Sequence, residues 1–164
     1  MGRDIYGNTP LMASGYDTVT EKPVEFLLKG GVRIVPANLG MDSVFYQMLD
    51  RLSVITGDDT YTKRVDSIYK WYLENGLDSR TKLGYWGGHT CIDLKTSGIY
   101  MSENTYTHEL KNTALYVAPF YRIDKKEAAQ IVRNIISGHV GNVDGWKNLA
   151  LNRHAFFDSA RFMS

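Results

Sequence analysis

This sequence lacks most of the features that quickly place a protein in a class. It contains a single cysteine, Cys91, so no disulfide can form within the chain and no structural metal site can be built from thiolates. No apolar run reaches the length that crosses a membrane, and the first residues lack the apolar segment of a signal peptide. We therefore expect no membrane partner, and the sequence does not decide between a cytoplasmic and a periplasmic location.

An excess of charge of one sign is also missing. The 19 lysines and arginines are balanced by 18 acidic residues, which gives a formal net charge of +1, and the basic residues are scattered along the chain. Nucleic-acid-binding proteins usually concentrate them in a stripe or patch, so we expect no nucleic-acid partner. With 43% hydrophobic and 23% charged residues, the composition is that of a folded globular protein.

Apolar periodicity predicts a pair of helices in the first half of the chain. The first runs from Met41 to Gly57, and the second follows a cap at Asp58-Asp59 and ends near Asn75-Gly76. So short a turn makes the two helices antiparallel, as an αα-hairpin. The apolar stripes consist of Met41, Val44, Phe45, Met48, Leu49, Leu52 and Ile55 in the first helix, and of Tyr61, Val65, Ile68, Tyr69 and Tyr72 in the second.

A second helical pair is predicted further along. Its first helix begins near Thr107 and includes Leu110, Ala114 and Tyr121, with a kink or early end at Pro119. Its second helix follows Asp124, which forms a capping-box pattern with Glu127, and it ends at Gly138. The helix–turn–helix unit thus occurs twice.

The two hairpins predict a mainly α fold, in which antiparallel helical hairpins form part of an α/α toroid (barrel). Residues 1–40 are expected to form an extended N-terminal arm with a short strand at 32–35. Residues 41–164 are expected to form the helical-hairpin segment of an incomplete barrel, and the whole chain a single domain. A β-hairpin or long loop is expected as an insertion around 84–101. Four helices cannot close such a ring, so we expect either a smaller helical domain or a segment of a longer protein. The abrupt end at Arg161-Phe162-Met163-Ser164 favours the segment.

Histidines and carboxylates suggest a metal site without defining one. The candidate ligands are His89, His108, Glu109, His139 and His154, and such a set is compatible with zinc, manganese, nickel, cobalt or iron. The alternative is that the histidines are satisfied separately. On a helix, side chains at 108 and 109 would diverge by about 100°, so only one of the two is expected to bind an ion.

Two further residues have both a functional and an ordinary interpretation. Arg153 can form a fork to the carboxylate of an anionic sugar, or a plain surface salt bridge. Trp86 can stack on a sugar, or fill space beneath the glycine-containing loop that follows it.

Four elements, taken in order, resemble the pectate lyases of polysaccharide lyase family 2. They are Tyr85-Trp86-Gly87-Gly88-His89, His108-Glu109-Leu110-Lys111-Asn112, His139-Val140 and Asn152-Arg153-His154. The resemblance implies an α/α-barrel enzyme that cleaves polygalacturonate or a similar acidic polysaccharide by β-elimination. It also implies a divalent metal cofactor, with manganese favoured, and identifies this chain as an N-terminal segment of the barrel.

The resemblance also assigns roles to residues. It places the metal on His89, Glu109 and His154, and makes Arg153 the catalytic base. Substrate-binding positions in the cleft would be Trp86, His108, Lys111 and His139. Two alternatives from other classes remain: a non-catalytic carbohydrate-binding helical segment, and an α/α-toroid glycoside hydrolase, whose two carboxylic acids would come from Asp93, Asp144 or Asp158.

Overall fold

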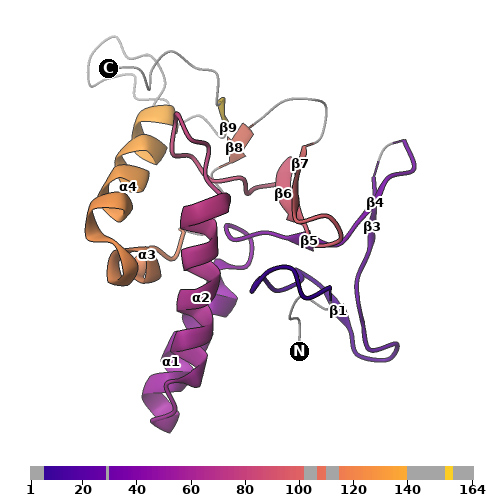
Figure 1. Ribbon diagram of the computed structural model, residues 1–164, viewed down its shortest axis with the longest axis horizontal. Coiled ribbons are helices and arrows are strands. Elements are labelled where there is room, and N and C mark those ends of the chain that lie inside the picture. Colours follow the sequence, from indigo (N-terminus) through magenta and orange to yellow (C-terminus); the bar gives the residue numbers. More distant parts are fainter. Residues whose placement is uncertain (1–5, 29, 102–106, 110–114, 140–153, 157–164) are drawn as a thin grey trace, which may run out of the picture.

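The computed structural model describes residues 6–28, 30–101, 107–109, 115–139 and 154–156, with the backbone alone described at Thr107 and at 154–156. Within these ranges the chain forms four helices and nine short strands. The helices lie together on one side of the molecule, and most of the strands lie on the other (Figure 1). No helix in these ranges is long and apolar enough to cross a membrane.

The prediction of a mainly α toroid is wrong. The nine strands of the described residues pair into four small antiparallel sheets, which make up much of the molecule beside the helices. Each of these strands is only two to four residues long. Strands this short leave little alternating pattern in a sequence, so the helical stripes dominated the prediction.

The first predicted hairpin is confirmed. Helix α1 spans Ser43–Thr56 and helix α2 spans Thr60–Asn75. Gly57 ends α1 in the left-handed conformation, with φ of 72°, and its N–H donates to the Ser53 carbonyl oxygen at 2.9 Å. Glycine is the residue best suited to that backbone conformation, which is why it marked the end of the helix in the sequence.

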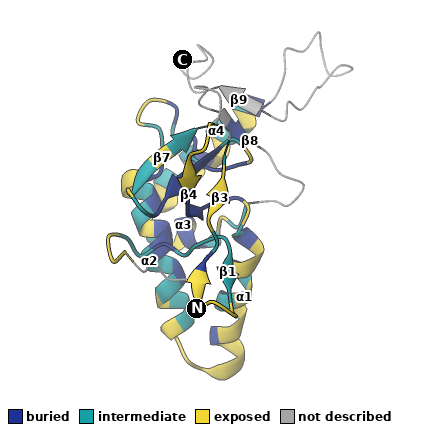
Figure 2. Cartoon of the chain, turned by 90° about the vertical axis from the view of Figure 1, so that its right-hand side faces the viewer, coloured by how far each residue is buried: buried dark blue, intermediate teal, exposed yellow. Residues whose placement is uncertain are grey.

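The two helices of the hairpin bury different kinds of side chain. Helix α2 buries its apolar stripe at Val65, Ile68, Tyr69 and Tyr72. Helix α1 instead buries Ser43, Tyr46, Asp50 and Ser53. Six members of its predicted stripe are exposed, and Figure 2 shows that the lower end of the hairpin is largely exposed as well. The six are Met41, Val44, Phe45, Met48, Leu52 and Ile55.

The predicted helix beginning at Thr107 is wrong at its start. Thr107–Glu109 form strand β8, and the only helix described in this stretch is α3, Ala118–Ile123, with Pro119 in its first turn. Proline is well tolerated there because its missing N–H would have no helical partner. Leu110 and Ala114 of the prediction lie outside the described residues.

The last predicted helix is confirmed as α4, Lys125–His139. The Asp124 carboxylate accepts the backbone N–H groups of Lys126 and Glu127 at 2.9 and 3.0 Å, so it caps the helix as its position in the sequence indicated. Helix α3 packs between α2 and α4, which ties the last helix to the hairpin.

One strand of the N-terminal part pairs with a later β-hairpin. Strands β6 (Thr90–Asp93) and β7 (Gly98–Met101) form the β-hairpin expected around 84–101, and β5 (Pro36–Ala37) adds to the edge of β6. Strand β8 pairs with β9, His154–Phe156. Two smaller ribbons pair β1 (Tyr16–Asp17) with β2 (Lys22–Pro23) and β3 (Phe26–Leu27) with β4 (Arg33–Ile34).

Aromatic rings form the centre of the core, where the helices meet the strands. Tyr69 contacts Phe120 edge to face at a ring-centroid distance of 4.7 Å, and Trp86 lies between Tyr72 and Phe120 at 6.0 and 6.5 Å. Ile68, Ile92 and Ile131 are fully buried in the same cluster. Trp86 is the first residue of the candidate site, so the core and the site share a border.

Candidate functional site

The indole of Trp86 fills the core beneath the loop that follows it. Its side chain is 2% exposed, and its ring meets the imidazole of His108 edge to face at 5.3 Å. A Cβ at position 84 would lie 1.5 Å from the indole, so Gly84 leaves the space that Trp86 occupies. The position of Trp86 therefore agrees with the interpretation that it fills space beneath the loop. Its contact with substrate stays a prediction.

Gly87 and Gly88 bring this loop against strand β8. Gly87 has φ of 134°, and a Cβ there would lie 2.5 Å from the Cβ of Glu109. Backbone conformation and space therefore both require glycine at this position. The N–H of Gly88 donates to Oε2 of Glu109. The pair of glycines thus lets the backbone reach a buried carboxylate that comes from a different part of the chain.

Strands β8 and β9 bring two of the predicted metal ligands to neighbouring positions. The register of the antiparallel pair sets Glu109 directly opposite His154, and His108 opposite Ala155. Glu109 is 2% exposed. His89, the third predicted ligand, is half-buried and immediately follows Gly88, whose N–H contacts Glu109. The Glu109 carboxylate, the backbone at His154 and the Gly88 N–H next to His89 therefore lie where a loop meets a two-stranded sheet.

His108 and His139 form a buried pair. Nδ1 of His108 lies 2.6 Å from Nε2 of His139, the last residue of α4, and the two residues are 1% and 0% exposed. Burial lowers the pKa of His108 to about 3, with a smaller lowering by His139, so its imidazole is neutral at ordinary pH. Among the residues that the structure describes, Nε2 of His108 has no hydrogen-bond partner.

Adjacent residues of a strand point to opposite faces. His108 and Glu109 lie on a strand rather than on a helix, and strand geometry also separates their side chains. That the two do not share one ion stays a prediction. Contact of His108 or His139 with substrate stays a prediction.

Arg153 and Lys111 lie outside the described residues. Among the side chains that are described, no three His, Cys, Asp or Glu residues form a group able to hold a metal ion, and the His154 side chain does not belong to that set. Of the proposed hydrolase acids, Asp93 is buried and its Oδ1 accepts the N–H of Val35 at 3.0 Å, while Asp144 and Asp158 also lie outside the described residues.

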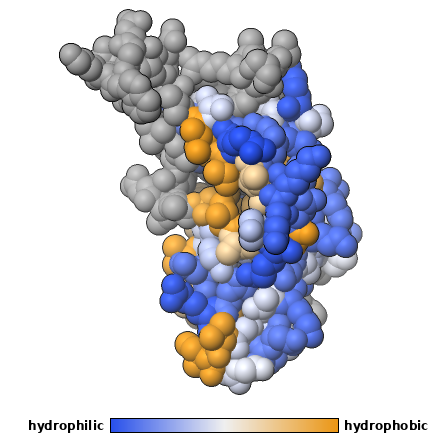
Figure 3. Space-filling model, turned by 90° about the vertical axis from the view of Figure 1, so that its left-hand side faces the viewer, coloured by the Kyte–Doolittle hydropathy of each residue, from blue (hydrophilic) through white to orange (hydrophobic). Residues whose placement is uncertain are grey.

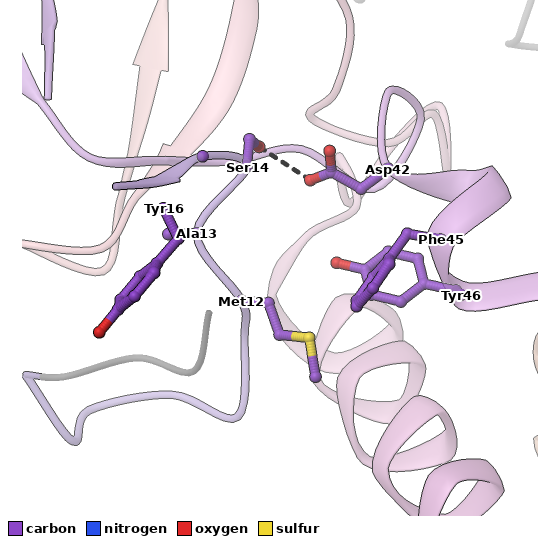
Figure 4. A pocket seen from close by; sticks show the side chains of 8 residues that line it. Met12, Ala13, Ser14, Tyr16, Asp42, Phe45 and Tyr46 are labelled. Carbon is purple, nitrogen blue, oxygen red and sulfur yellow. Dashed lines mark hydrogen bonds between the residues drawn. The ribbon is translucent and has the colours of Figure 1, made fainter. Parts of the chain in front are cut away.

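A pocket of about 290 Å³ lies at the start of α1, among residues for which the sequence suggested no functional role. Figure 4 shows Ser14 donating its hydroxyl to the Asp42 carboxylate at 2.8 Å beside the rings of Phe45 and Tyr46. Burial raises the pKa of Asp42. None of the predicted metal or substrate residues lines this pocket.

Sequence reasoning missed one residue that touches the loop directly. Asn38 is 4% exposed, and its carboxamide makes hydrogen bonds to the backbone of Gly87 and Thr90. The partners are far apart in the chain, and no spacing rule connects them. The four elements that carry the family resemblance do not include Asn38.

Comparison with known proteins gives two findings. The family model described as periplasmic pectate lyase matches residues 9–163. A pectate disaccharide-lyase of Dickeya dadantii (strain 3937) is 26% identical over 161 residues, which cover 98% of this chain and 29% of the relative. The chain therefore spans less than a third of the length of that curated relative.

Proposed function

Because the chain belongs to the periplasmic pectate lyase family, we propose that it carries the metal-binding part of a lyase that cleaves polygalacturonate-like acidic polysaccharide by β-elimination. The substrate class follows from the family and from the name of the D. dadantii relative. The family description also supports a periplasmic location, which the sequence left open.

One observation carries the proposal: the register of β8 and β9 sets Glu109 opposite His154. In an antiparallel pair, opposed positions carry side chains on the same face of the sheet, as two ligands of one ion require. The contact from Gly88 to Glu109 adds the loop that bears His89.

The donor chemistry fits a divalent metal. One carboxylate and two imidazoles suit manganese as well as zinc or iron, and the family resemblance favours manganese. Gly87 leaves room for Glu109 at the point of closest approach, and the Gly88 N–H orients the carboxylate. His89, Glu109 and His154 would hold the ion. A metal bound there would neutralise the uronate carboxylate and stabilise the charge that develops beside it.

The reaction also requires a residue of the chain to remove a proton from the substrate. In β-elimination a base removes the proton on C5 of the uronate, the C4–O4 bond breaks with its electron pair leaving on O4, and a C4–C5 double bond forms without consumption of water. The resemblance gives the role of base to Arg153. A free guanidinium has a pKa above about 12, and burial near a cation would lower it toward the range a base needs.

The proposal is tested with polygalacturonate and Mn²⁺, by following the ultraviolet absorbance of the unsaturated uronate product and, separately, Mn²⁺ binding by calorimetry. Glu109→Gln is expected to weaken Mn²⁺ binding at least about 100-fold, because a direct ligand should count for more than the outer-shell partners whose loss costs about 10–100-fold. Glu127→Gln, at a half-exposed carboxylate in the first turn of α4, is the matched control and should change neither readout.

Two outcomes would contradict the proposal. Equal Mn²⁺ affinity in the wild type and in Glu109→Gln would remove Glu109 from the site. Release of reducing sugar without any gain in absorbance would indicate hydrolysis, as in the glycoside hydrolase alternative.

A further inference from the structure

Asn38 lies where the N-terminal segment passes beneath the Gly87–Thr90 turn. It directly follows strand β5 and precedes helix α1, and it is 4% exposed. Its Nδ2 donates to the carbonyl oxygens of Gly87 at 2.7 Å and of Thr90 at 3.5 Å. Its Oδ1 accepts the N–H groups of Gly87 at 3.1 Å and of Met41 at 3.3 Å. The Asn38 side chain thus both donates hydrogen bonds to backbone groups and accepts them from backbone groups.

These contacts bracket the two residues that matter most for the candidate site. Gly88 and His89 lie between Gly87 and Thr90, and both ends of that short turn are bonded to Asn38. Among the described residues, this turn makes no strand pairing before Thr90, where β6 begins. Gly87 adopts a φ of 134°, a conformation that glycine tolerates and that other residues rarely adopt.

The backbone that carries this carboxamide is itself held in place. The backbone N–H of Asn38 donates to Oδ2 of Asp42 at 3.3 Å, and that oxygen also accepts the Ser14 hydroxyl (Figure 4). The N–H of the next residue, Leu39, donates to the hydroxyl of Tyr72 at 3.2 Å. Asn38 is therefore anchored to α1 and α2, and the turn is anchored to Asn38.

Only a primary amide matches all four contacts. Two backbone N–H groups meet one end of the side chain and two carbonyl oxygens meet the other. An aspartate would keep the acceptor but would face the Gly87 and Thr90 carbonyls with a second oxygen instead of an N–H. A buried acceptor set against acceptors is unfavourable.

From these contacts we infer that Asn38 is a positioning residue. It holds the Gly87–Thr90 turn so that the His89 position and the Gly88 N–H are presented to Glu109. The inference deepens the proposed function and rests on it, because the turn matters for metal binding only if His89 and Glu109 are ligands.

The test compares Asn38→Asp and Asn38→Ala with the wild type in two measurements. Backbone amide exchange should show a protected Gly87 N–H in the wild type and faster exchange in both variants. Mn²⁺ affinity should fall about 10–100-fold in both, as it does when residues that orient metal ligands are lost. Asn38→Asp, which is nearly isosteric, should be no better than Asn38→Ala.

Ser53→Ala is the matched control. It also removes a buried side-chain oxygen that accepts a backbone N–H, from Thr62 at 2.9 Å, but at the far end of α1. It should destabilise the protein while leaving Mn²⁺ affinity and Gly87 exchange unchanged. A role of Asn38 in stability alone would make its variants behave like this control, which would overturn the inference.

The outcomes separate the two proposals. Absence of Mn²⁺ binding in the wild type would overturn the proposed function and the metal role of Asn38 with it. Normal Mn²⁺ binding in the wild type, together with unchanged affinity in both Asn38 variants, would overturn the inference alone. Should the variants fail to fold, an unprotected Gly87 amide in the wild type is still enough to contradict it.

Discussion

Helices α1 and α2 belong to one hairpin and have similar apolar periodicity, but they bury opposite kinds of face. In α2 the apolar stripe from Val65 to Tyr72 is fully buried. In α1 the comparable stripe lies outside, with Met48 60% and Ile55 81% exposed. An apolar stripe therefore indicates that residues form a helix, but it does not by itself indicate which face the tertiary structure covers.

The buried face of α1 is held by polar contacts. The Asp50 carboxylate receives both terminal nitrogens of Arg122 in α3, at 2.8 and 3.1 Å, and the hydroxyl of Tyr116 at 2.6 Å. Such bidentate contacts fix geometry that apolar packing alone would not. Figure 3 shows apolar surface at the lower end of the molecule, where the hairpin turns, and Val54 and Ile55 are the exposed apolar residues at that end of α1.

The largest effect should come from the buried stripe of α2. Ile68→Ala is expected to lower the free energy of unfolding by about 2–5 kcal/mol, because it leaves a cavity in the core. Ile55→Ala, the same substitution on the exposed stripe of α1, should change it by no more than about 0.5 kcal/mol. Urea denaturation of the two variants measures the difference. Equal losses would show that the two stripes are buried alike.

A smaller effect is expected on the polar face of α1. Asp50→Ala should cost about 1.5–3 kcal/mol, the usual range for a charged hydrogen bond. Removing one partner of a fully buried ion pair costs about 3–5 kcal/mol. The loss of stability here should be smaller, because the Arg122 side chain is 36% exposed.

Asp66→Ala provides the comparison for Asp50. Asp66 contacts the same guanidinium at 2.6 Å but is 34% exposed, so its loss should cost about 0–1 kcal/mol. Thermal unfolding at low and high salt separates the two, since the more exposed Asp66 pair should weaken more with added salt. A larger loss of stability in Asp66→Ala than in Asp50→Ala would show that Arg122 is held mainly by Asp66 in α2, and would contradict the prediction.

The smallest effect is expected from Met48→Gln. Met48 is 60% exposed, so the free energy of unfolding should change by no more than about 0.5 kcal/mol. Leu49, its neighbour, is half-buried against the core, and Leu49→Gln should cost distinctly more. Chemical denaturation of both variants tests the assignment of the two faces. A loss above about 1 kcal/mol for Met48→Gln would contradict it.

The parts of the fold that could be predicted are those fixed by local interactions. Helices α1, α2 and α4 have their periodicity and their end signals, such as Gly57 and Asp124, within a few residues of each other. The stretch Thr107–Glu109 was assigned to a helix because its strand character depends on pairing with β9, which is distant in sequence. Tertiary pairing overrides local propensity at such positions.

The candidate site shows the same limit. His89, Glu109 and His154 were selected through family resemblance, because no spacing rule joins a loop, a strand and a second strand so far apart in the chain. The contacts of Asn38 could not be predicted for the same reason, since its partners Gly87 and Thr90 become its neighbours only in the folded protein.

The pairing of β8 with β9 has a consequence for the order of folding. The α1–α2 hairpin and the β6–β7 hairpin join residues close in sequence and should form early, whereas closing the long connection between Glu109 and His154 costs more chain entropy. The site would then be completed in a late step. In a refolding experiment, recovery of metal binding should lag behind recovery of helix content.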